Sequence, residues 1–144
     1  MKRIYLAGGW FTPEQEEEHT RIYELIKDDF HVFNPRLAGE VKDSTDEDYL
    51  QEILDGNIRH IENADVVVMI YDGKDTGTIW EAGYAFGVGT PIIYYAEKLN
   101  GKPFNIMLAK TGLFADNEAK LLELLNQDDT YVVKQKYVYE GNMI

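Results

Sequence analysis

The sequence predicts an α/β protein whose helices alternate with the strands of a largely parallel sheet. The strongest sign is the almost entirely apolar run at residues 65–71, as expected of a central strand buried on both faces. A helix is predicted after it and another strand at residues 90–95, and this spacing is typical of a right-handed βαβ unit. At 144 residues the chain is long enough for a single domain, residues 1–144, with a substantial core.

The first half of the chain follows the same pattern. A strand is expected at residues 2–7, ending at Gly8-Gly9. Thr12 and Gln15, with Pro13 between them, form a capping box that begins a polar helix. Pro35 stops a short strand that starts at residue 31, and residues 36–46 are expected to form a loop. We predict a helix over residues 46–63 because an apolar stripe repeats there every three or four residues, and the stripe includes Asn57.

The second half is expected to complete the sheet. Residues 98–103 read as a polar loop and residues 105–108 as a short apolar segment. An amphipathic helix is predicted at residues 118–127 and a final strand at residues 130–133. The chain ends in Tyr137, Val138, Tyr139, Met143 and Ile144, which is apolar enough that we expect it to dock on a protein surface.

Composition limits the classes of function. The formal net charge of −12 repels phosphate backbones and argues against nucleic-acid polymers as partners. The chain contains no cysteine, which removes thiolate catalysis, disulfides and thiolate metal sites, and its three histidines have no metal-ligand spacing. It lacks an apolar run long enough for a membrane span or a signal-peptide core, so a cytoplasmic protein without membrane contact is expected.

The segment 75–84, DTGTIWEAGY, carries the chemistry because it follows the central strand and opens a helix. Ligands of open α/β sheets bind at this rim. Thr76 or Thr78 is expected to cap the helix, which places Glu81 in its first turn. Glu81 is then either a solvent-facing acid favoured by the helix dipole or a semi-buried nucleophile or base.

The glycine turn after the first strand is a second candidate binding element. Gly8-Gly9 lets the backbone approach a ligand, but it is neither a G-x-G-x-x-G fingerprint nor a P-loop. Trp10 and Phe11 at its mouth either staple the first helix to the sheet or form a lid over a ring.

The chain resembles the nucleoside 2-deoxyribosyltransferases in three segments that follow one another in the expected order: 4–12 (IYLAGGWFT), 75–85 (DTGTIWEAGYA) and 101–107 (GKPFNIM). The residues Tyr139-Glu140-Gly141 near the end also resemble that family. The resemblance covers nearly the whole chain. It implies a flavodoxin-like three-layer sandwich with a five-stranded, mostly parallel sheet. It also implies a homo-oligomer, a homodimer or homohexamer with shared sites. The activity implied is exchange of the base on 2'-deoxyribonucleosides with free purine or pyrimidine bases, in nucleotide salvage, without a cofactor or a metal.

The resemblance also assigns roles by position. Glu81 matches the catalytic glutamate, Asp75 an acid six residues earlier, and Tyr5 a tyrosine near the nucleophile. Asn105 and Met107 match residues that reach into a neighbouring subunit's site. The substrate-binding set expected on these grounds is Gly9, Trp10, Phe11, Asn57, Gly77, Asn105 and Met107.

One position departs from the family pattern. The family usually has a proton-transferring Asp eight residues before the acid that opens the central strand, and counting back from Asp65 gives Asn57, with Asp55 nearby. An asparagine can hold a base by hydrogen bonds but cannot act as its acid. Proton transfer would then use Asp75, Asp55 or water, or the preferred base would differ.

Two other functions fit the same residues. One is an N-glycoside hydrolase of deoxynucleosides or deoxynucleotides on the same fold, in which water is the acceptor. The other is a non-catalytic nucleotide-binding module, which would tolerate the loss of Glu81.

Overall fold

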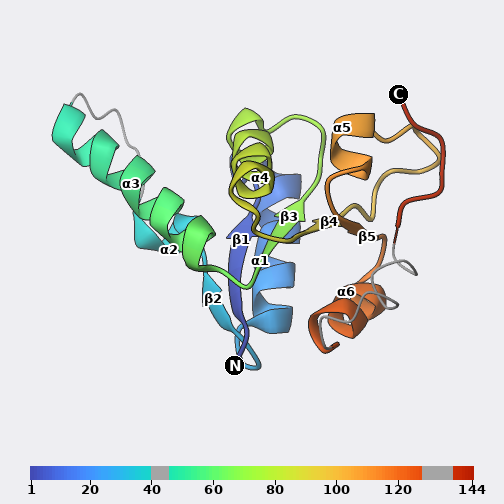
Figure 1. The fold of residues 1–144 in the computed structure, drawn as a ribbon, viewed down its shortest axis with the longest axis horizontal. Coiled ribbons are helices and arrows are strands. Elements are labelled where there is room, and N and C mark those ends of the chain that lie inside the picture. The colour runs from blue at the N-terminus through green and yellow to red at the C-terminus, as the bar shows by residue number, and fades with distance from the viewer. Residues whose placement is uncertain (40–45, 128–137) are drawn as a thin grey trace.

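The computed structural model describes residues 1–39, 46–127 and 138–144, and its centre is a sheet of five parallel strands (Figure 1). The strand order is β2-β1-β3-β4-β5, the doubly wound order of flavodoxin-like folds. Its strands are β1 (Arg3–Ala7), β2 (His31–Phe33), β3 (Val66–Ile70), β4 (Ile92–Tyr95) and β5 (Leu113–Ala115). The predicted fold class is therefore confirmed.

Six helices are present in the described parts of the chain. Five of them come directly after a strand and α3 comes after α2; α2 and α5 are short, with four residues each. The helices are α1 (Pro13–Ile26), α2 (Pro35–Ala38), α3 (Glu47–Asn63), α4 (Thr76–Val88), α5 (Ile106–Ala109) and α6 (Glu118–Leu125). The capping box predicted at Thr12 and Gln15 begins α1 as expected.

Alternate residues of each strand point to opposite faces, so the sheet separates two apolar cores. Ile22 and Ile26 of α1 and Leu121 of α6 cover one face. Ile61 of α3, with Ala82 and Ala85 of α4, covers the other. The three layers follow from this division, and the C-terminal ends of β1, β3 and β4 meet at one rim.

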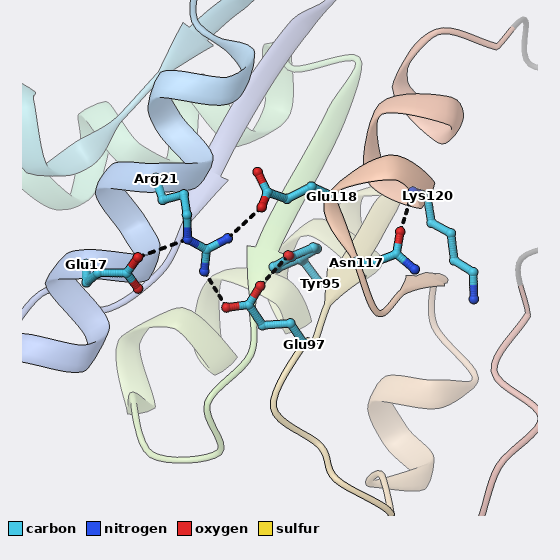
Figure 2. Close-up of polar contacts among 7 residues, drawn as sticks. All are labelled: Glu17, Arg21, Tyr95, Glu97, Asn117, Glu118 and Lys120. Carbon is cyan, nitrogen blue, oxygen red and sulfur yellow. Dashed lines mark hydrogen bonds and ion pairs between the residues drawn. The ribbon is translucent and has the colours of Figure 1, made fainter.

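A network of charged residues joins the elements on the first face. Arg21 of α1 pairs with Glu17 on its own helix, with Glu97 after β4 and with Glu118 of α6 (Figure 2). The Tyr95 hydroxyl also donates to Glu97, at 2.6 Å. One guanidinium therefore holds α1, the end of β4 and α6 together.

The structure corrects three of the element predictions. Strand β5 was not predicted, and α2 begins at Pro35 and takes up the first residues of the segment 36–46 that was expected to be a loop. In α4 the N-cap is Asp75, whose Oδ1 accepts from the Thr78 N–H at 2.9 Å, so the helix begins at Thr76. Glu81 consequently lies in the second turn, where the dipole contributes less to its environment. The strand predicted at residues 130–133 lies outside the described residues.

The apolar stripe of α3 is only partly covered by its own chain. Ile61 is buried, most of the other members are half-buried, and Leu54 is 41% exposed. In Figure 1 α3 extends outward from the body of the domain, which explains this exposure.

The C-terminal segment docks on its own chain. Backbone hydrogen bonds join Phe104 to Asn142 and Ile106 to Ile144, and Tyr139 and Met143 pack against the core around Phe104. This docking was predicted, although Ile144 stays 73% exposed and Tyr137 lies outside the described residues.

No helix in the described parts of the chain combines the length and the apolar character needed to cross a bilayer.

Candidate active site

Tyr5 and Glu81 form the centre of the candidate site. Tyr5 lies in the middle of β1 and is fully buried, and Glu81 projects from α4 toward it. The Tyr5 hydroxyl donates a hydrogen bond to Glu81 Oε2. A carboxylate 76 residues away in the chain is thereby fixed against the central strands.

The Glu81 carboxyl lies in an apolar environment. Burial raises its pKa from the usual 4.5 to about 8. Among the described residues no lysine or arginine pairs with it, so nothing compensates the ionised form except the Tyr5 hydrogen bond. The ionised form of such a carboxyl is stabilised most when a positive charge develops next to it.

The glycine turn packs directly against the start of α4. A Cβ atom at Gly9 would lie 2.6 Å from Asp75 Oδ2 and 2.8 Å from the Gln15 side chain. Any larger residue at this position would force the Asp75 or Gln15 side chain to move. One Asp75 oxygen caps α4, and the other faces the turn.

A link between Gln15 and Asp72 supports the turn, and sequence reasoning missed it. Gln15 Oε1 accepts from the Phe11 N–H at 2.9 Å, and its Nε2 donates to Asp72. Asp72 Oδ1 accepts from the Asp75 N–H at 3.2 Å. Partial burial alone would raise the pKa of Asp72, but these hydrogen bonds and one from the Lys74 N–H outweigh it and lower the pKa.

A buried histidine lies beneath the same turn. His19 is 1% exposed, its Nε2 is 2.9 Å from Asn34 Oδ1, and its Nδ1 lies 3.0 Å from where a Gly8 Cβ would be. Burial lowers the pKa of His19. The neutral ring therefore joins the β1 turn to the cap of α2, and its sequence position gave no signal of this role.

The aromatic residues of the rim differ in how they pack. Trp10 stacks on Phe11 at 5.2 Å and meets His19 edge-on at 5.8 Å, as expected if it staples the turn to α1. Phe11 is 76% exposed. Trp80, which is 51% exposed, stacks on Tyr84 at 5.4 Å, and the Tyr84 hydroxyl donates to Glu62 of α3. Phe11 and Trp80 thus remain available to a ligand or a partner.

Comparison with known proteins decides the family. The model of the family described as Nucleoside 2-deoxyribosyltransferase matches residues 4–129. The chain belongs to the nucleoside 2-deoxyribosyltransferase family. No curated protein matches the chain.

Solved structures of this fold include enzymes of two kinds. A 2-deoxyribosyltransferase from Bacillus psychrosaccharolyticus shares 22% identity with a TM-score of 0.72, covering 98% of this chain and 99% of that one. A 2-deoxyribosyltransferase from Leishmania mexicana shares 21% identity with a TM-score of 0.51, covering 95% and 96%. A CMP N-glycosidase from Clostridium botulinum shares 20% identity with a TM-score of 0.50, covering 87% and 98%. At these identities the likeness shows the fold.

The residue at the variable family position, Asn57, lies in a separate hollow of about 210 Å³ beside α2 and α3. Phe33 lines this hollow and also packs on Tyr5, with ring centroids 5.5 Å apart. Asp55 is exposed and accepts from Gln51 Nε2 at 2.9 Å. Asn57 therefore lines a hollow next to Phe33, which packs on Tyr5, and Asp55 faces solvent.

The other family positions lie at the surface of the chain. Asn105 caps α5 by accepting from the Met107 N–H at 2.9 Å, and Met107 is 71% exposed. Gly77 is exposed in the first turn of α4. The structure thus pairs Tyr5 with Glu81 and Gly9 with Asp75, whereas Asn105 and Met107 lie at the start of α5, apart from these contacts.

Within the described residues, no group of three or more histidine, aspartate or glutamate side chains is arranged to hold a metal ion.

Proposed function

We propose that this protein transfers 2-deoxyribose between nucleobases with Glu81 as the nucleophile. The observation that carries the proposal is the mostly buried Glu81 carboxyl, held by Tyr5 and lacking a cationic partner among the described residues. Breaking an N-glycosidic bond creates positive charge at C1' of the sugar. A carboxylate poorly compensated in the free enzyme stabilises that charge more in the transition state than in the ground state.

The reaction takes two displacements. First, a Glu81 oxygen bonds to C1' while the C1'–N bond breaks, and the departing base keeps the electron pair and takes up a proton. Then a nitrogen of the incoming base attacks C1' from the face that the first base left, the Glu81–C1' bond breaks, and the incoming base gives up one proton to the proton carrier that supplied the first base. Two inversions give net retention, and no cofactor enters the balance.

The proton on the base must come from a group other than Asn57, which has no acidic proton to give. Asp55 is solvent-facing and bonded to Gln51. Asp75, with one oxygen facing the glycine turn, or a water is therefore the proton carrier in this mechanism.

The substrate is a nucleoside with a free 5'-hydroxyl. Asp75 presents a carboxylate oxygen at Gly9, where a hydroxyl can donate to it but a phosphate would be repelled. Asn105 is a second hydrogen-bonding group for the sugar, contributed by another subunit.

The site is completed by a second copy of the chain. Several large apolar side chains are exposed, which is typical of a surface that contacts another protein. They are Met107 (71% exposed), Phe86 (58%), Trp80 (51%) and Leu54 (41%). Burying such residues against a partner would exclude water from the covalent intermediate, which otherwise hydrolyses. Asn105 and Met107 are proposed to enter the neighbouring site.

Incubation with deoxyinosine, with and without adenine, tests the proposal. Formation of deoxyadenosine only when adenine is present is the expected result. The CMP N-glycosidase of the same fold makes hydrolysis the second candidate function. Free deoxyribose at the same rate with and without adenine would favour the hydrolase, and no reaction would favour a binding module.

A further inference from the structure

A second cavity lies at the C-terminal rim of the sheet, on the side of α1. Its volume is about 390 Å³, within the range of small-molecule sites. It is enclosed by the first turns of α1 and by the loops after β3 and β4. Tyr5 and Glu81 do not line it, and Gln15 and Asp72 form the wall nearest to their site.

Three lysines converge on this cavity from two loops. Lys74 follows β3, and Lys98 and Lys102 follow β4. None of them has an ion-pair partner among the residues that the structure describes. A carboxylate pairs with Arg3, Arg21, Lys27, Arg36 and Lys120 elsewhere in the described residues, whereas Lys2, Arg59 and Lys110, like the cavity lysines, form no ion pair there. In a chain with a formal charge of −12, three unpaired lysines around one cavity favour an anionic ligand.

Three acidic residues also line the cavity, Glu14, Glu18 and Asp72, and Glu14 is exposed to solvent. Asp72 is occupied by Gln15 and by backbone N–H groups. Glu18 forms part of the floor and is 4% exposed. Burial and the neighbouring Glu97 carboxyl raise the pKa of Glu18 to about 7, so at neutral pH about half of it is protonated, and the protonated form can donate a hydrogen bond. Arg21 and Tyr95 hold Glu97 in place (Figure 2).

The remaining wall is apolar and contains an aromatic ring. Tyr71, Leu99 and Pro103 line it, and the Tyr71 ring is fixed edge-on against Phe104 with centroids 5.0 Å apart. A flat ring can pack on such a surface. The cavity therefore offers a cationic end for a phosphate, where lysines act as point charges, and an apolar surface with a buried hydrogen-bonding group for a ring.

We propose that this cavity binds a nucleoside monophosphate, with the phosphate at Lys98, Lys102 and Lys74 and the base against Tyr71, Leu99 and Pro103. This site is separate from the one at which Glu81 acts, so the bound nucleotide is an effector and not the substrate.

Calorimetric titration of adenosine 5'-monophosphate into the full-length Glu81→Gln protein tests this, because that background removes turnover. Adding Lys98→Ala with Lys102→Ala should weaken binding at least tenfold. The matched control, Lys27→Ala with Lys120→Ala, removes the same charge from ion-paired lysines outside the cavity and should leave binding unchanged. All four lysines are exposed, so the variants should fold.

Adenosine and inorganic phosphate separate the two halves of the ligand. Each should bind at least tenfold more weakly than the monophosphate. Equal affinity for phosphate alone would overturn the assignment of the ring surface, and equal affinity for adenosine would overturn that of the lysines. The proposal as a whole fails if the monophosphate shows no saturable binding, or if the cavity and control variants weaken it equally. None of these outcomes depends on deoxyribose transfer.

Discussion

Replacing Glu81 by glutamine should change how the stability of the protein depends on pH. A carboxyl with a raised pKa stabilises the fold fully below its unfolded value, near 4.5, and this contribution is lost as pH rises through about 8. The shift of roughly 3.5 units corresponds to about 5 kcal/mol in total, at ~1.4 kcal/mol per unit. Between pH 6 and pH 9 the loss is roughly 3 kcal/mol of unfolding free energy.

Urea unfolding of wild type and Glu81→Gln at pH 6 and pH 9 measures this loss. Glutamine keeps the size of the side chain and cannot ionise. The variant should therefore lose roughly 3 kcal/mol less than wild type across this interval, while Glu18 and all other groups titrate equally in both proteins. In the same range the transfer rate of wild type should rise with pH up to about 8, since the nucleophile must be ionised. If stability depended on pH in the same way in the two proteins, the conclusion that the Glu81 carboxyl is buried without a compensating charge would be refuted.

Three further substitutions probe the surroundings of Glu81. Gly9→Ala forces a Cβ to 2.6 Å from Asp75, so transfer should fall at least tenfold while circular dichroism stays native; full activity would show that the turn tolerates a shift. Asn57→Asp should alter the ranking of acceptor bases and Asn57→Leu should fold yet transfer poorly, whereas unchanged kinetics in the leucine variant would assign Asn57 a packing role. Mixing inactive Glu81→Ala with inactive Asn105→Ala subunits should restore part of the transfer activity, and a fully active monomer in sedimentation would contradict the shared site.

Much of the fold could be predicted because its signals are local. The run that forms β3 is apolar at every position, and the capping box of α1 lies within four residues. Strand β5 has only three residues and is defined by pairing with β4, so its own sequence carries no comparable signal. The cap of α4 was predicted at Thr76 or Thr78 instead of Asp75 because all three residues can cap a helix, and only the structure shows which does.

The candidate site was predictable in its residues but not in its contacts. The sequence and the family resemblance placed Glu81 and Tyr5 in one site, and the structure joins them. The hydrogen bond from Gln15 to Asp72 spans 57 residues and has no sequence pattern. The exposure of α3 could not be predicted either, because periodicity shows that a helix has an apolar face but not whether its own chain covers that face.

The most direct test of the account is to look for the covalent intermediate on Glu81. The protein would be incubated with deoxyinosine without an acceptor base, quenched with acid and digested, and the peptide that contains residue 81 analysed by mass spectrometry. We expect this peptide to gain the mass of one deoxyribosyl group and to lose it when adenine is added before the quench. The Glu81→Ala protein should show no adduct and at most about a tenth of the wild-type transfer rate, which corresponds to a barrier increase of at least ~1.4 kcal/mol. Transfer to adenine by a Glu81→Ala protein at near wild-type rate, or an adduct on another residue, would contradict it.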